Sequence, residues 1–464
     1  MRIYNSLSRK VEEFKPQHED LVTMYCCGPT VYSFATIGNY RTYFLADIVN
    51  RTLGLNGYKV HFVMNITDVG HLTGDNEGDA DSGDDRMEKS ASKEGKSAKE
   101  IADFYTKDFL KQYDKLNLKR PIKFTKATEY IDKQIQLVGT LEDKGYTYRT
   151  SDGIYFDTSK YKKYGQLSGL TVENIKEGAR IEPNPEKKNP TDFALWKFSP
   201  VGTGEQRQQE WDSPWGKGFP GWHLECSAMS LSELGETVDI HLGGEDLKMI
   251  HHQNEIAQSE CATGKEFVKY WIHGAFMQVE GGRMGKSLGN AYLVPNIEEH
   301  GFDPLVLRYF YMTAHYRTPL NFTWEAMQNA QNSLNKLYDL VSGLKPDKDG
   351  KVSEKYMERF KDKLNDDFNL PEALAVTWEM LKNSISESSK LVTAAKMDEV
   401  LGLKLDERIG YEIPQKVMDM AKTREEYRKN GIWEKADVLR KQIAEAGFVL
   451  EDLPEGSFKI KRKY

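Results

Sequence analysis

The chain has 464 residues, of which 39% are hydrophobic and 29% charged, and its net charge is −7 at pH 7. This length suggests about three domains, and four cysteines are too few for a disulfide-stabilised fold. The acidic balance excludes a uniformly basic nucleic-acid binder, although a local basic face is compatible with it. No apolar run reaches the roughly 18 residues of a membrane span, and no apolar signal segment is present, so we expect no membrane association and a cytoplasmic location.

Strand patterns alternate with helical patterns before residue 300. The strand patterns lie at 21–27, 58–66, 238–242 and 271–277, and a helical pattern lies at 36–53. This alternation indicates an α/β fold with a doubly wound parallel sheet. In such sheets ligands bind beyond the carboxyl ends of the strands. The segments that follow those ends are Cys27-Gly28, Thr67-Asp68, Gly243-Gly244 and the loop 281–290.

A long intrusion separates the second strand from the third. Residues 73–88 are acidic and contain several glycines, which predicts a mobile loop. The segment 146–156 reads as a hairpin about Asp152-Gly153. We expect an insertion into the sheet domain at roughly 115–215.

Helical patterns replace strands after residue 300. Thr323 is a good N-cap for a helix that Gly343 should end. Its apolar positions, which step by three and four, are Met327, Ala330, Leu334, Leu337 and Val341. A second helix is expected at 371–381, with Pro371 in its first turn, and the last ~50 residues should form a separate unit with helices near 414–429 and 433–446.

Two cysteines, a histidine and a glutamate form a candidate metal site. His251 and Glu255 are four residues apart in a helical segment, so they share one face. Cys27 and Cys226 add two thiolates, and this donor set suits Zn²⁺. Taken singly, a cysteine is usually a small buried apolar residue and such a His/Glu pair is usually exposed. A purely structural interpretation of each residue therefore stays open.

Cys26 and Cys27 are adjacent in a predicted strand and so point to opposite faces of the sheet. Only one of them can contribute to a shared site. Cys27, which precedes the glycine turn, is the better candidate ligand, and we expect Cys26 to serve in packing.

Two segments are candidates for binding a nucleotide. The Thr-Ile-Gly-Asn segment at 36–39 lies where a strand, a turn and a helix would present backbone N–H groups to phosphate. The loop 281–290 offers Lys286, Ser287 and several glycines, so it could close over a polyphosphate. Neither segment fits the Walker pattern, and a solvated turn is the alternative for both.

Several motifs in this order resemble the cysteinyl-tRNA synthetases, a family of class I aminoacyl-tRNA synthetases. They are CCGPTVYSFATIGNYRTY from residue 26, MNITD at 64–68, GWHLECSAMS at 221–230, DIHLGGEDLKMIHHQNEIAQSE at 239–260 and GGRMGKSLGN at 281–290. The likeness continues through LRYFYMTAHYRTPLNF and into the C-terminal LEDLPEG. Linked motifs of this length are far more specific than any one of them.

The resemblance implies ATP-dependent activation of L-cysteine to cysteinyl-adenylate, followed by transfer to the 3′ end of cysteine tRNA. It implies one Zn²⁺ per chain, held by Cys27, Cys226, His251 and Glu255, and ATP as a substrate with Mg²⁺. Zinc would bind the substrate as a thiolate, which a serine hydroxyl cannot easily match. An apolar pocket alone rejects such a near-isostere weakly.

The resemblance also implies roles for individual residues. Those expected to bind cysteine are Cys27, Gly28, Thr67 and Trp222. Those expected to bind ATP are Thr36, Gly38, Asn39, Gly243, Gly244, Asp246, Arg283, Met284 and Lys286. Those expected to act in catalysis, by positioning and charge stabilisation, are Thr36, Asn39, Arg283, Lys286 and Ser287. Those expected to read the anticodon are Arg428, Asp437 and Asp452.

Four residues depart from the pattern of the family, and one of them is Leu242, which takes the first place of the usual three-glycine run. Thr36 stands where the first signature usually has histidine, and it cannot be a cation. In the second signature, Arg283 keeps a positive charge where lysine is usual, and Gly285 should loosen the loop. We interpret the catalytic apparatus as intact but atypical.

The domain organisation that the resemblance implies has five parts. They are a Rossmann-like catalytic domain in two halves at 1–114 and 216–320, a connective insertion at 115–215, an all-α tRNA-binding region at 321–408 and a small anticodon-reading unit at 409–464. We expect a monomer.

Three alternative functions remain open. One is a ligase that passes the cysteinyl-adenylate to a small-molecule amine, although a relative of that kind lacks the anticodon-reading end. Another is a catalytically silent paralogue that binds tRNA or senses cysteine, which Thr36, Arg283 and Gly285 would favour. The third is a purely structural zinc protein.

Overall fold

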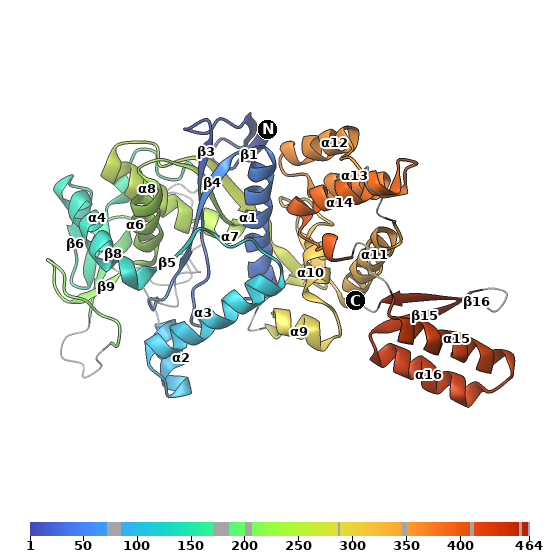
Figure 1. Ribbon diagram of the computed structural model, residues 1–464. Helices are drawn as coiled ribbons and strands as arrows, with labels where there is room; N and C mark the ends of the chain where they lie inside the picture. Colours follow the sequence, from blue (N-terminus) through green and yellow to red (C-terminus); the bar gives the residue numbers. More distant parts are fainter. Residues whose placement is uncertain are drawn as a thin grey trace.

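The structure, a computed structural model, describes residues 1–71, 85–169, 185–199, 207–285, 288–345, 350–408, 413–453 and 457–462. Its centre is a parallel sheet, in which β3, β4 and β5 can be seen in Figure 1. The order of its strands is β11-β10-β3-β4-β5. The strands are β3 (Leu21–Cys26), β4 (Lys59–Ile66), β5 (Lys123–Lys126), β10 (Val238–Gly244) and β11 (Val268–Gly274). The predicted parallel sheet is confirmed. The strand expected at 271–277 instead ends at Gly274, and Met277 begins another strand.

The order of the strands reverses between β3 and β10. From β3 the chain adds β4 and then β5 on one side, whereas β10 and β11 lie on the other. Such a reversal opens a crevice at the carboxyl ends of the two central strands. Cys27 directly follows β3 at this point, and its N–H donates to the carbonyl oxygen of Leu242 on β10 at 3.0 Å.

Helices cover both faces of the sheet. The helix α1 (Ile37–Leu55) packs on one face, and α6 (Trp222–Leu234) packs on the other beside α8 (His251–Thr263) (Figure 1). Cys26 belongs to the apolar cluster under α1, whereas Cys27 belongs to a cluster on the opposite face that includes Cys226. The predicted division between the two adjacent cysteines is therefore confirmed.

An antiparallel sheet is inserted between the halves of the parallel sheet. Its strands, in order, are β6 (Thr147–Arg149), β7 (Gly153–Phe156), β8 (Phe193–Phe198) and β9 (Gly218–Pro220). The predicted hairpin at 146–156 is confirmed as β6 and β7. The helix α4 (Ile131–Asp143) packs against α6, and short 3₁₀ turns lie at Ala127–Tyr130 (η2) and Thr158–Lys160 (η3).

The limits predicted for this insertion need adjustment. β5 lies within the predicted range 115–215 but pairs with β4 in the parallel sheet, and β9 lies beyond it but pairs with β8. We therefore propose that the insertion runs from the end of β5 to the start of α6. Most of the predicted acidic loop at 73–88 lies outside the described residues, but Arg86 already begins a helix, α2 (Arg86–Glu94).

Smaller elements surround the parallel sheet. They are the hairpin β1 (Arg2–Asn5) and β2 (Lys10–Glu13), the helices α3 (Ala98–Lys115), α7 (Glu245–Lys248), α9 (Val294–Glu299) and α10 (Pro304–Tyr311), and a sheet of β12 (Met277–Val279), β13 (Gly282–Arg283) and β14 (Leu320–Phe322). β12 and β13 connect the end of β11 to the loop 281–290.

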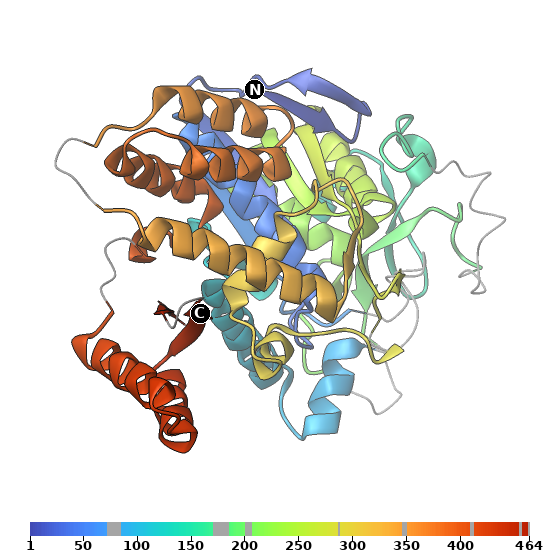
Figure 2. The ribbon, with the colours of Figure 1, turned by 90° about the vertical axis from the view of Figure 1, so that its right-hand side faces the viewer.

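A helical region packs beside α1 (Figures 1 and 2). Its helices are α11 (Trp324–Ser342), α12 (Glu354–Asn365), α13 (Leu370–Lys382) and α14 (Glu387–Leu401), followed by a 3₁₀ turn, η5 (Asp406–Arg408). The side chain of Thr323 accepts from the N–H of Ala326, which confirms the predicted N-cap. The five predicted apolar positions of α11 are all buried.

The C-terminal unit stands apart from the rest of the molecule (Figure 1). It contains α15 (Gln415–Lys429), α16 (Trp433–Glu445), β15 (Phe448–Leu453) and β16 (Ser457–Arg462) around an apolar cluster of its own. The two predicted helices are confirmed, and the antiparallel pair β15–β16 is an addition to the prediction. Among the described residues, no helix has both the length and the apolar character that crossing a bilayer requires.

Candidate functional site

A cavity of about 230 Å³ opens where the sheet order reverses. Predicted site residues that line it are Cys27, Gly28, Asn39, Trp222, Gly244 and Asp246. They come from the ends of β3 and β10 and from the first turns of α1, α6 and α7. Segments more than 200 residues apart in the sequence thus meet at one crevice, as the doubly wound fold predicts.

Gly28 allows the chain to turn closely over the end of β4. Its N–H donates to Oδ1 of Asn65 at 2.7 Å. A Cβ at this position would lie 1.9 Å from the carbonyl oxygen of Asn65. Only glycine fits so close to another backbone segment, and this turn directs Cys27 toward α6 and α8.

The structure brings the four predicted metal ligands together. One donor atom from each of Cys27, Cys226, His251 and Glu255 lies within 4.8 Å of the others. The Sγ atom of Cys27 is 3.9 Å from Sγ of Cys226 and 3.7 Å from Oε1 of Glu255. That oxygen is 3.1 Å from Nε2 of His251. Elements from three separate parts of the chain supply these atoms, and every side chain is buried.

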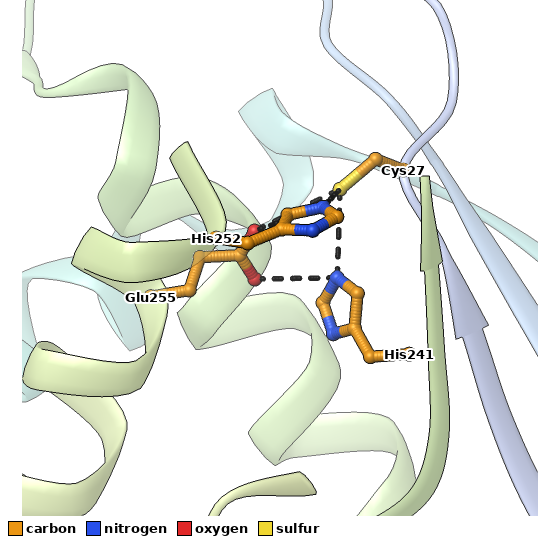
Figure 3. A group of neighbouring side chains, drawn as sticks. All are labelled: Cys27, His241, His252 and Glu255. Atoms are coloured by element: carbon orange, nitrogen blue, oxygen red, sulfur yellow. Dashed lines mark hydrogen bonds and ion pairs between the residues drawn. The ribbon is translucent and has the colours of Figure 1, made fainter. Parts of the chain in front are cut away.

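Two histidines extend this cluster beyond the prediction. His241 on β10 and His252 on α8 form a second group with Cys27 and Glu255 (Figure 3). Their Nε2 atoms lie 3.6 Å and 3.3 Å from Sγ of Cys27. Nε2 of His241 is also 3.6 Å from Oε2 of Glu255. Cys27 and Glu255 therefore belong to both groups.

Hydrogen bonds between histidines orient the rings. Nδ1 of His251 lies 2.9 Å from Nδ1 of His223, so its Nε2 faces Glu255. Nδ1 of His252 lies 2.8 Å from Nε2 of His273. A second hydrogen bond of this kind commonly fixes a metal-binding imidazole. Half of the ten histidines of the chain lie between 223 and 273, and this concentration is the sequence signal that could have revealed the wider network.

Burial disfavours the ionised form of two of the candidate ligands when no metal is bound. It raises the pKa of Glu255 and of Cys27 well above their ordinary values, whereas a hydrogen bond from Cys27 lowers the pKa of Cys226. Burial also lowers the pKa of His241 and His252 well below the ordinary value, so these imidazoles are neutral and could serve as metal ligands. Oε2 of Glu255 is buried without a hydrogen-bond partner. Two thiols, neutral imidazole and an unsatisfied carboxylate fit a divalent cation of zinc type.

Trp222 connects the cluster to the cavity. Its ring centroid lies 4.3 Å from that of His251, and the side chain lines the cavity at the first turn of α6. Thr67, in contrast, is buried beside the cavity and accepts from Nδ2 of Asn65 at 3.0 Å. Thr67 does not line the described cavity.

The Thr-Ile-Gly-Asn segment forms the start of α1. Thr36 is its N-cap, and Oγ1 of Thr36 accepts from the N–H of Asn39 at 3.3 Å. Oδ1 of Asn39 in turn accepts from the N–H of Thr36 at 2.8 Å and from its hydroxyl at 2.8 Å. This capping box defines where α1 begins, and it occupies the N–H groups of Thr36 and Asn39.

The two signature segments contact each other. A Cβ at Gly38 would lie 3.4 Å from Sδ of Met284, and the N–H of Ile37 donates to the carbonyl oxygen of Tyr292 at 2.9 Å. Arg283 is exposed on β13. Lys286 and Ser287 lie outside the described residues.

Asn290 organises the described part of the second signature loop. Its Oδ1 accepts from the N–H of Gly285 at 2.9 Å, and its Nδ2 donates to the carbonyl oxygen of Arg283 at 3.1 Å. These two hydrogen bonds restrain the loop at Gly285, where the sequence suggested that glycine would loosen it.

The two glycines at the end of β10 lie in close contact with their surroundings. A Cβ at Gly243 would be 2.6 Å from the ring of His252, and one at Gly244 would be 2.3 Å from Oδ1 of Asp246. Gly243 therefore makes room for the histidine network, while Gly244 and Asp246 face the cavity.

Arg41 is a residue of this region to which the sequence pattern assigned no role. It is buried on α1, and its Nη1 donates to the carbonyl oxygens of Ala275 and Phe276 at 2.8 and 2.9 Å. Its Nη2 donates to those of His315 and Thr318 at 3.4 and 2.6 Å. The guanidinium group thus ties the first signature helix to the chain between β11 and β12.

The predicted anticodon residues lie in the C-terminal unit. Nη1 of Arg428 donates to Oδ1 of Asp452 at 2.6 Å, and Arg424 binds both oxygens of the same carboxylate at 2.6 and 3.2 Å. Asp437 is exposed on α16. Arg424 contributes to this ion-pair cluster without having been predicted.

Comparisons with known proteins agree with this geometry. The family described as tRNA synthetases class I (C) catalytic domain matches residues 13–332. The chain is 45% identical to Cysteine–tRNA ligase 1 of Burkholderia lata, covering 98% of this chain and 96% of that one. It is 40% identical to Cysteine–tRNA ligase of Treponema denticola, covering 97% and 98%.

Solved structures show the same fold at low sequence identity. A methionyl-tRNA synthetase of Mycobacterium tuberculosis bound by methionyl-adenylate has a TM-score of 0.54 and 13% identity, covering 85% of this chain and 92% of that chain. A second structure of that enzyme with methionyl-adenylate gives a TM-score of 0.54 and 14% identity. Together with the near full-length identities, these findings show that the chain belongs to the cysteine–tRNA ligase family of class I aminoacyl-tRNA synthetases.

Proposed function

We propose that the protein activates L-cysteine with ATP and transfers it from cysteinyl-adenylate to the 3′ end of cysteine tRNA. The observation that carries this proposal is the convergence of Cys27, Cys226, His251 and Glu255 beside a cavity at the sheet reversal. The family membership gives the reaction type. The donor set gives the preference for a thiol-bearing amino acid.

The buried donor set would hold one Zn²⁺ on the cavity wall. Bound there, zinc would act as a soft Lewis acid toward the sulfur of cysteine. The serine hydroxyl is a harder donor that ionises less easily, so the site would discriminate where an apolar pocket could not. His223 would hold the ring of His251, and Trp222 would cover the substrate side of the pocket.

The chain itself would position the reacting groups. The N-terminal turn of α1, ordered by Thr36 and Asn39, would direct the positive end of a helix toward anionic phosphate oxygens. Gly38, Gly243, Gly244, Asp246 and Met284 would complete the ATP site, with Mg²⁺ bound to the phosphates. Arg283, Lys286 and Ser287 would stabilise the charge that develops on pyrophosphate. In-line attack by the cysteine carboxylate needs no nucleophile from the protein.

We infer that the C-terminal unit binds the anticodon of the tRNA. Arg428, Asp437 and Asp452 offer a guanidinium group and two carboxylates to unstacked bases. Because Arg424 and Arg428 neutralise Asp452 in the free chain, base binding would exchange these ion pairs for contacts with RNA. The presence of this unit favours tRNA over a small amine as the acceptor. The monomeric state is a further part of the proposal.

The test is charging of cysteine tRNA by the wild type and by Cys226→Ser, with zinc content measured on the same samples. We expect Cys226→Ser to lose most of its zinc and to lose cysteine activation. Cys261→Ser, which changes a buried cysteine outside the cluster, should keep both. A zinc-free Cys226→Ser that charges normally would contradict the role of the metal.

Cysteine-dependent ATP–pyrophosphate exchange separates the enzyme from a silent paralogue. We expect exchange by the wild type despite Thr36, Arg283 and Gly285, because Thr36 still caps α1 and Asn290 restrains the second loop. If the wild type shows no exchange at saturating substrates, we would conclude that the chain is a binding protein without catalytic activity.

A further inference from the structure

We propose that an exposed aromatic cluster at the mouth of the cavity stacks the unpaired nucleotides at the 3′ end of the tRNA. The cluster consists of Phe34, Phe104 and Tyr105, and this inference rests on the proposed function. It adds to that function a binding surface for single-stranded RNA beside the adenylate site.

The cluster is continuous with the cavity. Phe34 lines the cavity and is 37% exposed, while Phe104 on α3 is 46% exposed. The ring centroids of Phe34 and Phe104 are 5.9 Å apart, and those of Phe34 and Tyr105 are 4.9 Å apart. Isolated exposed apolar side chains are common, but adjacent exposed rings that continue a binding cavity indicate a binding surface.

Contacts with α2 hold the cluster in place. Nη1 of Arg86 donates to the hydroxyl of Tyr32 at 2.9 Å, and Oγ of Ser90 donates to the carbonyl oxygen of Tyr32 at 3.1 Å. Tyr105 donates to Oε1 of Glu94 at 3.1 Å. The aromatic rings are therefore displayed on a braced surface and not on a free loop.

Positively charged side chains lie near the aromatic rings. Nζ of Lys96 lies 5.0 Å from the ring centroid of Phe104, and it pairs with Glu94 at 2.8 Å. Arg86 lines the cavity, and Lys93 is exposed on the same helix, α2. Aromatic faces beside cations are the combination that binds single-stranded nucleic acid, because bases stack on the rings while cations attract phosphates.

The second step of the proposed reaction needs such a surface. The terminal adenosine must bring a ribose hydroxyl to the adenylate inside the cavity, so the nucleotides before it must cross the mouth. These nucleotides are unpaired and their faces are available for stacking. RNA has an aromatic base at each nucleotide and can therefore stack on the cluster. Cysteine has no aromatic ring that could stack there.

The test compares Phe104→Leu, which keeps apolar bulk without a π face, with Phe104→Trp, which keeps a π face. We expect Phe104→Leu to lower kcat/KM for cysteine tRNA about tenfold and to leave cysteine-dependent pyrophosphate exchange at the wild-type level. Phe104→Trp should charge within about threefold of the wild type. The control is Ile122→Ala, because Ile122 is exposed before the amino end of β5 and is not among the residues that line the cavity.

Binding of complete tRNA and of tRNA that lacks its unpaired 3′ nucleotides gives an independent readout. Phe104→Leu should weaken binding of the complete tRNA and leave binding of the truncated tRNA unchanged. Equal charging by Phe104→Leu and the wild type would overturn the inference, as would equal losses in Phe104→Leu and Phe104→Trp. A loss of pyrophosphate exchange in Phe104→Leu would assign the cluster to ATP or cysteine and overturn it as well. If the wild type shows no exchange, the proposed function fails, and the two tRNA forms still decide whether the cluster binds an unpaired 3′ end.

Discussion

At the scale of single residues, the site depends on how closely backbone segments approach one another. Gly28 passes over the carbonyl oxygen of Asn65, and Gly243 lies against the ring of His252. A side chain at either position would separate segments that carry metal-ligand candidates. The glycine next to Cys27 and the glycine near the end of β10 are therefore structural requirements of the cluster.

Gly28→Ala should destabilise the fold by about 3 kcal/mol, because its Cβ would lie 1.9 Å from a backbone oxygen that cannot move away easily. Gly139→Ala in α4 is the control, since a Cβ there meets no atom within 4 Å. The control should stabilise the protein by up to about 1 kcal/mol through its higher helix propensity. Denaturant unfolding measures both, and equal effects of the two substitutions would refute the steric argument.

At the scale of elements, α1 is held by its first turns to the segments that frame the second signature loop. The capping box of Thr36 and Asn39 starts the helix, and Arg41 then donates to carbonyl oxygens of the segments that precede β12 and β14. Burial lowers the pKa of Arg41 to about 10, so the guanidinium group stays charged at neutral pH. We interpret Arg41 as a positioning residue for the two segments that are candidates for binding phosphate.

Arg41→Met should lower kcat for cysteine activation about 100-fold with a smaller change in the KM for cysteine, because small displacements of positioned groups reduce the rate strongly. Arg41→Lys should recover only part of this loss, since one ammonium group cannot reach carbonyl oxygens on both segments. Pyrophosphate exchange measures both constants. Unchanged kcat in Arg41→Met would show that the helix keeps its place without these hydrogen bonds.

At the scale of the whole molecule, a buried ion pair joins the sheet domain to the helical region. Nη2 of Arg308 donates to Oδ2 of Asp47 on α1 at 2.6 Å, and Nε donates to the carbonyl oxygen of Leu401 at the end of α14 at 2.6 Å. Both charged side chains are fully buried. Arg51 also donates to Asp47 and to the carbonyl oxygen of Glu399. This network couples the helix that begins at the site to the proposed tRNA-binding region.

Arg308→Met should destabilise the protein by about 3–5 kcal/mol, because it leaves the carboxylate of Asp47 buried with fewer partners. Arg359→Met is the matched control, since Arg359 pairs with Glu379 on the surface, where both side chains are at least 41% exposed. We expect the control to cost less than about 1 kcal/mol. A small effect of Arg308→Met would mean that the two regions associate through apolar packing alone.

The same network predicts a pH dependence. Burial opposes ionisation of Asp47, but Arg308 and Arg51 outweigh it and lower the pKa of this carboxyl below the ordinary value. A lowered folded-state pKa stabilises the fold fully above about pH 4, and this contribution falls as the pH drops through the folded-state pKa. The difference in unfolding free energy between the wild type and Asp47→Asn should therefore be large at pH 7 and shrink below pH 4. A difference that stays constant over this range would contradict the assignment.

The sequence by itself determined the parallel sheet, the helices and the family. Local signals sufficed for these, because strand and helix periodicity, caps such as Thr323 and glycine turns act over a few residues. The resemblance also pointed to Cys27, Cys226, His251 and Glu255, although no spacing rule connects residues so far apart.

Only the tertiary structure decided which other side chains share the site. His241 and His252 reach Cys27 because β10 pairs beside β3 and α8 packs against α6, and these contacts are not encoded in a local pattern. The same holds for Arg41 and for the aromatic cluster of Phe34 and Phe104, whose members lie about 70 residues apart. The physical reason is that long-range packing sets distances between segments, whereas sequence periodicity sets only which face of a segment is buried.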